Sequence, residues 1–166
     1  MKIKLNREYF LRHFFVAVLL LGLGGYFGYD GLLGYPSQSA HDLFVSIEKS
    51  EPKESVDLEA FKAQKIRTQY FFALAALIAG AMVAIDLASV AKFSLAYDEN
   101  GFEYDGRRYR YDDVLGIDDS LWTKKTIAKV LLKDDRVMKL DGWHHSGIKE
   151  FLAKLPKPEK KSEAAS

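Results

Sequence analysis

The sequence predicts an α+β chain in which a two-helix transmembrane hairpin is followed by a small antiparallel β domain with a C-terminal helix as its cap. Three observations predict this arrangement. Two apolar blocks are each long enough to cross a bilayer. Two glycine turns then separate short strands with alternating polarity. Finally, the last apolar stripe of the chain has helical spacing.

Composition excludes several classes of protein. The chain has 166 residues, a formal net charge of +1 and no cysteine. It therefore has neither a disulfide framework nor a thiol catalyst. A nearly neutral chain exerts no general attraction on nucleic acid, so neither DNA nor RNA is an expected partner.

The apolar blocks are Phe14–Leu33 and Tyr70–Phe93. A hydrocarbon core needs about 20 apolar residues of helix, so both blocks qualify as membrane spans. A signal peptide is the alternative for the first block, but the block is too long and no A-x-A cleavage site follows it. Each block holds one acid near an end, Asp30 and Asp86, where water or headgroups are within reach. Transport of ions or protons is therefore not expected.

The positive charges favour a cytoplasmic location for both termini. Eight lysines and arginines lie in the flanks before the first span and after the second, against five in the connecting loop, and cytoplasmic flanks carry the excess. We expect a multi-pass protein of the cytoplasmic (inner) membrane. The flanking residues are Lys2, Lys4, Arg7, Arg12, Lys92, Arg107, Arg108 and Arg110, and the loop residues are Lys49, Lys53, Lys62, Lys65 and Arg67.

Small residues predict that the two spans pack against each other. Small side chains let helix backbones approach closely where no hydrophobic force acts between helices. We expect pairing within the hairpin, because its helices are already tethered; homodimerisation is the alternative. The candidate packing residues are Gly24 and Gly28 in the first span and Ala76, Gly80, Ala84 and Ala88 in the second.

The loop at residues 35–68 is expected to be extracytoplasmic and to contain a short amphipathic helix. Ser39 and Asp42 have the spacing of a capping box. A second helix is expected to begin near Ser55 and to continue into the second span. The apolar stripe of the short helix should lie on that second helix or on the membrane surface, with a partner protein as the alternative. The stripe consists of Ala40, Leu43, Phe44 and Ile47.

Residues 93–155 begin with a predicted three-stranded meander. The dipeptides Asn100-Gly101 and Asp105-Gly106 are strong signals for two-residue hairpin loops. The first loop would place Tyr97 opposite Tyr104, and the second Phe102 opposite Tyr109. Strand alternation then collects one aromatic face and one charged face. The aromatic face holds Phe93, Leu95, Tyr97, Phe102, Tyr104, Tyr109 and Tyr111, and the charged face holds Asp98, Glu103, Arg108 and Arg110.

A further hairpin and a terminal helix complete the domain. A three-residue loop at 134–136 would set Leu132 opposite Met138. The terminal helix should cover an open end of the sheet and stop at Pro156. Its apolar stripe is Ile148, Phe151, Leu152 and Leu155. The expected divisions are 1–34 (basic cytosolic N-terminus and first span), 35–68 (loop), 69–92 (second span), 93–155 (cytosolic domain) and 156–166 (disordered tail).

Three stretches of residues 93–155 carry a resemblance: ENGFEYDGRRYRYDDVLGID, KVLLKDDRVMKLDGW and GIKEFLAKL. In their order of turns, strands and helix they resemble bacterial pleckstrin-homology-like (PH-like) domains attached to membrane spans. The resemblance implies a small bent sheet capped by a helix, associated with protein contacts or lipid surfaces rather than catalysis. The segment is short for a seven-stranded barrel, so a strand is expected to be missing or merged.

The candidate contacts with lipid or a partner are basic. Specific phosphoinositide recognition is not expected, because the loop at 98–101 that would have to supply cations is acidic. A general contact with anionic lipid remains open, at about 1 kcal/mol per cation. The alternative is a solvated face with cross-strand pairs such as Glu103 with Arg108. The candidate residues are Arg107, Arg108, Arg110, Lys124 and Lys125.

No catalytic, cofactor or metal site is predicted. Adjacent acids in separate turns do not supply the spaced oxygens of a calcium loop. The pair His144-His145 lacks a third ligand nearby and is interpreted as a helix start. We therefore expect a non-enzymatic anchor or accessory subunit of a membrane complex, whose partners are the bilayer and a protein. The alternative is a membrane-tethered sensor of anionic lipid headgroups, and homo-oligomerisation stays open.

Overall fold

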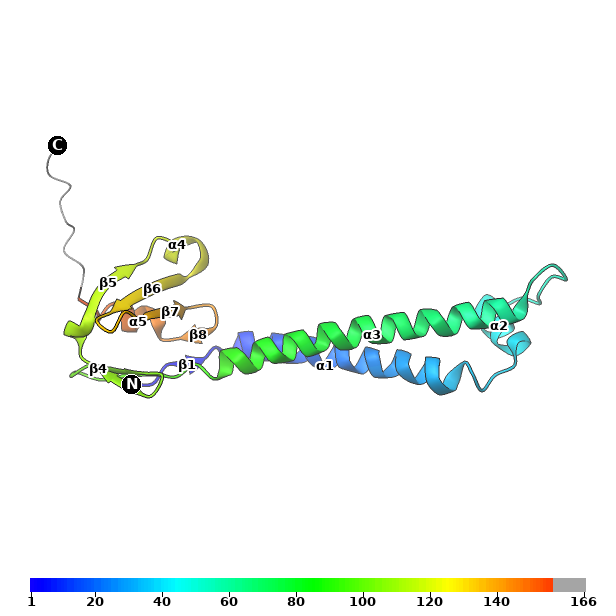
Figure 1. Cartoon of the computed structure of the whole chain (residues 1–166), viewed down its shortest axis with the longest axis horizontal. Coiled ribbons are helices and arrows are strands. Elements are labelled where there is room, and N and C mark those ends of the chain that lie inside the picture. Colours follow the sequence, from blue (N-terminus) through cyan, green and yellow to red (C-terminus); the bar gives the residue numbers. More distant parts are fainter. Residues whose placement is uncertain (157–166) are drawn as a thin grey trace, which may run out of the picture. The chain divides into compact units, whose positions relative to one another are not determined.

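The computed structural model describes residues 1–156 and divides into two compact units. Unit 1 comprises Met1–Leu11 and the chain from Ala88 onward, and unit 2 is Arg12–Leu87. The α+β class is confirmed, with two long apolar helices, small antiparallel sheets and a C-terminal helix (Figure 1). The predicted disordered tail lies, apart from Pro156, outside the described residues.

Each long helix begins at a polar cap. Helix α1 (Arg7–Tyr29) follows Asn6, whose side-chain oxygen accepts a hydrogen bond from the Glu8 amide at 3.0 Å. It therefore starts earlier than the apolar block alone predicts, and one π-helical turn (η1, Asp30–Gly34) extends it. Helix α3 (Leu58–Ala91) begins close to the predicted position, because the Asp57 carboxylate accepts from the Ala60 amide at 3.0 Å.

The short helix α2 (Ala40–Glu48) is the predicted amphipathic helix, and it packs on α3. Ser39 caps it, accepting from the Asp42 amide at 3.0 Å, while the Ser39 hydroxyl donates to the Asp42 carboxylate at 2.6 Å. Leu43 is fully buried, and the Phe44 ring centroid lies 4.9 Å from that of Phe61 on α3. The stripe thus packs on the second helix, the first of its expected locations.

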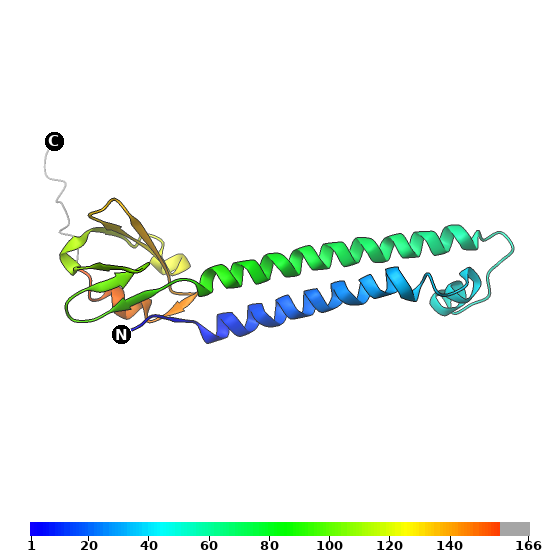
Figure 2. The ribbon, with the colours of Figure 1, turned by 60° about the horizontal axis from the view of Figure 1, so that its bottom comes forward.

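Within unit 2, α1 and α3 run side by side and antiparallel (Figure 2). The most buried positions recur every seven residues on both helices, which is the seam of a left-handed helix pair. A Cβ added to Gly24 would lie 2.6 Å from Leu77 Cγ, and one added to Gly80 would lie 2.9 Å from Leu21 Cγ. Pairing within the hairpin is therefore observed. The seam contains Ala17 and Gly24 on α1, Gly31 on η1, and Ala73, Gly80 and Leu87 on α3.

The predicted four-residue stripe follows this seam only in part. Ala76 and Ala84 are half-buried, Ala88 is exposed, and nothing lies within 4 Å of the position that a Cβ would take on Gly28. Four residues turn a helix by roughly 400°, so a four-residue stripe drifts by about 40° at each step. Seven residues drift by only about 20°, so the heptad stays on the seam while the stripe leaves it.

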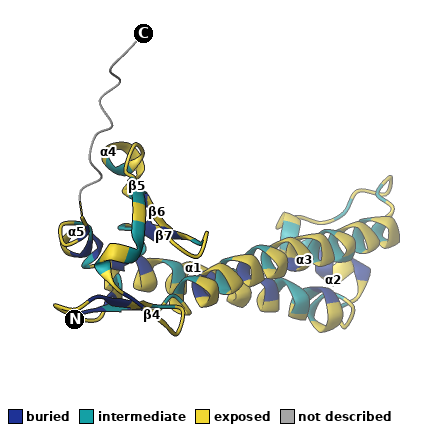
Figure 3. Cartoon of the chain, turned by 60° about the vertical axis from the view of Figure 1, so that its left-hand side comes forward, coloured by how far each residue is buried: buried dark blue, intermediate teal, exposed yellow. Residues whose placement is uncertain are grey.

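The outer surfaces of both long helices are exposed, as Figure 3 shows in yellow, and many of the exposed side chains are large and apolar. Phe15, Phe71 and Met82 keep 67%, 68% and 66% of their surface exposed. Both helices are long and apolar enough to cross a membrane. Only 11% and 17% of their most apolar stretches are buried, so neither resembles the core helix of a soluble domain.

Unit 1 contains three small antiparallel sheets, with strand orders β2-β3-β4, β5-β6-β7 and β1-β8. Among the described residues seven short strands follow α3, and they belong to three separate sheets. The expectation that a strand of a PH-like barrel is missing or merged stays a prediction. The elements of unit 1 are β1 (Lys4–Leu5), β2 (Leu95–Tyr97), β3 (Phe102–Tyr104), β4 (Arg107–Tyr109), η2 (Tyr111–Asp113), β5 (Val114–Asp118), α4 (Trp122–Lys125), β6 (Ile127–Leu132), β7 (Val137–Asp141), β8 (His145–Ser146) and α5 (Ile148–Leu152).

The N-terminus is part of this domain, which the sequence did not predict. Strand β1 pairs with β8, and the Ile3 amide donates to the Leu95 carbonyl at 2.8 Å. A bridge also joins Lys2 to Ala96 on β2. Ile3 is 5% exposed and belongs to the core. The segment expected to be a free basic flank therefore lies between β8 and β2.

The Asp105-Gly106 turn has the predicted register, whereas the Asn100-Gly101 turn does not. Phe102 pairs with Tyr109 as expected, and both turn residues have positive φ, +50° and +72°. At the first turn Tyr97 pairs with Phe102 instead of Tyr104. The loop is lengthened because the Asp98 carboxylate accepts from the Asn100 amide at 2.8 Å.

The β6–β7 hairpin has a three-residue loop, as predicted, but the loop lies one residue earlier. The Leu132 amide donates to the Arg136 carbonyl at 2.9 Å, and Val130 pairs with Met138. Asp135, the last loop residue, has φ +60°, the left-handed position of such loops. In both mispredicted hairpins the register moves by two residues, so every side chain keeps its predicted face.

The aromatic face forms the core, and α5 covers it. Phe102 and Phe151 are fully buried, with ring centroids 5.3 Å apart. The terminal helix begins at Ile148 and not at the histidine pair, because His145 lies in β8 and Gly147 takes a φ of +92° that breaks the helical backbone. The interpretation of His144-His145 as a helix start is therefore wrong.

Candidate functional site

Two of the five predicted basic contact residues are engaged by carboxylates. Arg108 donates to both oxygens of Asp98, at 2.6 and 2.7 Å, and this bond holds the pKa of the Asp98 carboxyl below its usual range. Arg107 lies 3.7 Å from Asp134. The cross-strand partner of Arg108 on β3 is Glu103, as predicted, but its ion pair is with Asp98.

The other three basic residues are exposed, one after β4 and two on α4. Arg110 follows β4, and its backbone amide donates to the Asp113 carboxylate at 2.8 Å. Lys124 and Lys125 are in the single turn of α4. Within residues 1–156 no recorded contact joins these two lysines to the arginines. The five residues therefore offer dispersed charge and not a single anion site.

Two of the adjacent acid pairs, at 112–113 and 118–119, supply carboxylates that accept hydrogen bonds within turns. Asp113 accepts from the Arg110 amide, and Asp118 accepts from the Ser120 hydroxyl at 2.6 Å and from its amide at 3.1 Å. These hydrogen bonds lower the pKa of both carboxyls. In residues 1–156 no group of three or more histidine and acidic side chains is arranged to hold a metal ion.

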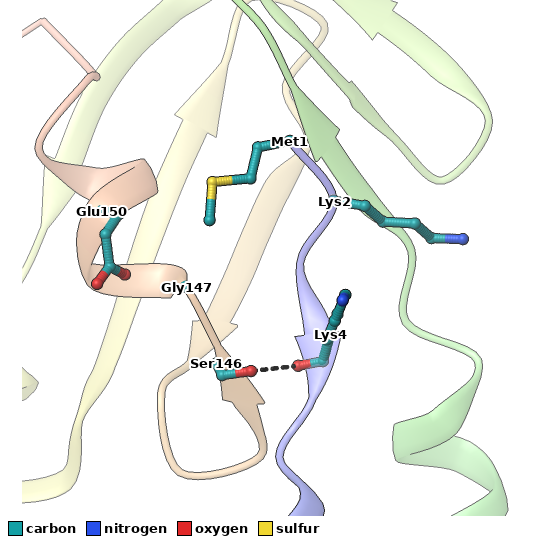
Figure 4. A pocket seen from close by; sticks show the side chains of 6 residues that line it. All are labelled: Met1, Lys2, Lys4, Ser146, Gly147 and Glu150. Carbon is teal, nitrogen blue, oxygen red and sulfur yellow. Dashed lines mark hydrogen bonds between the residues drawn. The ribbon is translucent and has the colours of Figure 1, made fainter.

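One hollow of unit 1 lies between β1 and α5, with a volume of about 490 Å³ (Figure 4). Its wall is held by the Ser146 hydroxyl, which donates to the Lys4 carbonyl at 3.2 Å. In Figure 4 the Lys2 side chain points away from Glu150, so the charged groups do not converge. The lining residues are Met1, Lys2, Lys4, Ser146, Gly147 and Glu150.

A second hollow, of about 290 Å³, lies at the end of α3. The Asp141 carboxylate organises one wall, accepting from the Trp143 amide at 2.9 Å and lying 3.3 Å from His144 Nδ1. The Tyr9 ring lies 4.5 Å from the His144 ring on its other side. The lining residues are Ser89, Val90 and Phe93 from the α3 end and Lys139, Asp141, His144 and His145 from β7 and β8.

His145 joins this end of α3 to the sheet. It is 6% exposed, its Nε2 lies 3.2 Å from the Val90 carbonyl oxygen, and its ring centroid lies 4.3 Å from that of Phe93. Its Nδ1 is buried without a hydrogen-bond partner among the described residues. Burial lowers the pKa of His145, which favours the neutral ring. This role could not be predicted, since neither β8 nor its contact with α3 is visible in a local sequence pattern.

The outer face of the β5-β6-β7 sheet carries exposed apolar side chains. Leu131 and Val137 are directly opposite each other and are 40% and 55% exposed. They line a shallow groove of about 380 Å³ that is bounded by Lys129 on β6. Lys139 lies opposite Lys129 on the same face. This apolar pair faces away from the core and has no cover within the described chain.

Comparison of the chain with protein-family models, with curated protein sequences and with solved structures gives no match. The function therefore has to be argued from the geometry of the two units.

Proposed function

We propose that this chain is a small integral membrane protein whose two long helices anchor a PH-like interaction domain. It acts as an anchor or accessory subunit of a membrane complex, with both termini in the cytoplasm, and it is not an enzyme. The observation that carries the proposal is the apolar and exposed outer surface of α1 and α3, which a lipid bilayer would cover along its length.

The N-terminal strand supports retention of both helices as membrane spans. Residues before α1 hydrogen-bond to β2 and β8, which follow α3. Cleavage after a signal peptide would remove β1 together with the buried Ile3. The same pairing supports a location of both ends of the hairpin on one side of the membrane, which the charge distribution also favours.

The exposed Leu131–Val137 pair supports a protein contact by the domain. Exposed apolar side chains gathered on a sheet face are typical of interaction surfaces. The described hollows of unit 1 are open and lack a converging set of charged groups, whereas catalysis uses such a set with strongly perturbed pKa values.

The test is a pull-down of the full chain from membranes in mild detergent after light cross-linking. We expect a stoichiometric partner that is lost from the Leu131→Ser/Val137→Ser double variant. The matched control is Leu121→Ser, which removes an exposed leucine outside the sheet. A partner retained equally by both variants would refute the sheet face as the contact, and purification without any partner would refute the accessory role.

The alternative function, recognition of anionic lipid through Arg107, Arg108, Arg110, Lys124 and Lys125, is less well supported. A lipid phosphate would have to displace Asp98 from Arg108 and Asp134 from Arg107. We therefore expect the Arg108→Glu/Arg110→Glu double variant to retain its binding to anionic liposomes. Loss of that binding would favour the lipid-sensor function over the accessory role.

A further inference from the structure

The hollow at the end of α3 combines apolar and cationic walls. Val90, in the last turn of α3, and Phe93, just after it, form the apolar wall. Lys139 supplies the cation. It has no carboxylate within ion-pair distance among the described residues, and its cross-strand neighbour is another cation, Lys129. Like charges directly opposite each other are unfavourable, so an anion at this place would stabilise the pair.

The one carboxylate of the hollow is already occupied. Asp141 accepts from the amides of Trp143 and His144, at 2.9 and 3.3 Å, and lies 3.3 Å from His144 Nδ1. These contacts occupy both oxygens of the carboxylate. Lys139 is therefore left as the side chain that is available to a bound anion.

The hollow lies beside both helix ends. Val90 is one residue before the end of α3, and Asn6, which precedes α1, donates from its side chain to the Trp143 carbonyl at 3.1 Å. Trp143 lies in the loop between β7 and β8 and is 55% exposed. Tryptophan is enriched at the level of lipid headgroups, so an exposed tryptophan next to the ends of two candidate membrane spans favours a lipid as the ligand of this hollow.

We propose that the hollow at the end of α3 binds the phosphate group of a membrane phospholipid, with Lys139 as its cation and Val90 and Phe93 against the apolar part of the lipid. This inference rests on the proposed membrane anchorage. It places lipid contact at the helix end, on an unpaired lysine, and not on the arginines of β4 that are paired with carboxylates.

The test uses Trp143 as the reporter. The chain has two tryptophans, so the Trp122→Phe variant leaves Trp143 as the one fluorophore. The full chain is reconstituted in phosphatidylcholine bilayers with a minority of phosphatidylglycerol. In one sample the phosphatidylglycerol carries brominated acyl chains, which quench tryptophan, and in a second sample the phosphatidylcholine carries them. We expect brominated phosphatidylglycerol to quench Trp143 more than its share of the bilayer accounts for.

Two variants locate the site. Lys139→Ala should lower this preference about fivefold, the effect of one cation near a lipid surface, whereas Lys129→Ala should retain it. A preference unchanged by Lys139→Ala, or lowered equally by both variants, would overturn the site. Relief of quenching by excess glycerol phosphate would also overturn it, because the ligand would then be a water-borne phosphate ester.

A flotation measurement separates this inference from the proposed function. If the chain fails to float with the vesicles after alkaline washing, the membrane anchorage itself is wrong, and the lipid site with it. If the chain floats but Trp143 shows no preference for phosphatidylglycerol, only the lipid site is wrong. The Trp143→Phe variant, which retains Trp122, should show no selective quenching.

Discussion

Substitution of Gly24 tests the helix seam most sharply, because the chain supplies its own control. A Cβ on Gly24 would lie 2.6 Å from Leu77 Cγ and 3.2 Å from the Leu77 backbone nitrogen, so the neighbouring helix has to move. A Cβ on Gly28, one turn away on the same helix, meets nothing within 4 Å. We therefore predict that Gly24→Ala destabilises the helix pair and that Gly28→Ala does not.

The magnitude follows from the comparison of the two variants. Both gain the higher helix propensity of alanine, about 1 kcal/mol in water, so this effect cancels in the difference between them. What is left is the overpacking of Gly24→Ala, about 1–3 kcal/mol. The equilibrium constant for separation of the helices should therefore differ by about five- to 150-fold between the two variants.

The assay is a titration of the full chain from mild detergent into dodecyl sulfate. A cysteine pair introduced on α1 and α3 can carry the labels for a distance measurement, since the chain has no cysteine of its own. The midpoint of helix separation should fall for Gly24→Ala and stay at or above that of the unsubstituted chain for Gly28→Ala. Equal midpoints for the two variants would refute the seam.

Three further predictions concern unit 1. Ile3→Ala should lower the unfolding free energy of the domain by about 2–5 kcal/mol, measured by thermal melting, because Ile3 is buried in a core formed mainly by residues after α3. The lowered pKa of His145 means that the unfolded chain binds more protons just below its ordinary pKa of about 6.5, so stability should fall as the pH drops below that value. In thermal melting across the same pH range, His145→Phe should show a weaker dependence of stability on pH. An unchanged pH dependence would contradict the role given to His145. Arg108→Ala should raise the pKa of Asp98 in an NMR titration, since the hydrogen bond from Arg108 is the main cause of its lowering. The unsubstituted chain should lose stability as the pH falls through the folded pKa of Asp98, and this loss should be smaller in Arg108→Ala.

Local patterns predicted the elements of this fold well where each element carries its own signal. The Asp105-Gly106 turn, the Ser39 cap and the stripe of α5 all depend on residues within a few positions of one another. The face of each β-strand was also predictable, because a register error of two residues leaves the alternation intact.

Long-range pairing was not predictable in the same way. Strand β1 is short, and the bond between the Ile3 amide and the Leu95 carbonyl spans most of the chain. In the sequence, residues 1–5 show only a basic flank. The same holds for the hollow at the end of α3, since Val90, Lys139 and His144 come from three separate elements that only the tertiary fold brings together.

The central claim is that two membrane spans carry both ends of the chain on one side of a bilayer. Single cysteines at Glu51, in the loop before α3, and at Lys149, on α5, test it in sealed membrane vesicles with a membrane-impermeant maleimide. We predict that Glu51→Cys and Lys149→Cys are labelled from opposite sides, with Lys149→Cys labelled from the cytoplasmic side, and that both variants stay in the membrane after alkaline extraction. Labelling of both positions from the same side, or release of the chain by extraction, would contradict the account.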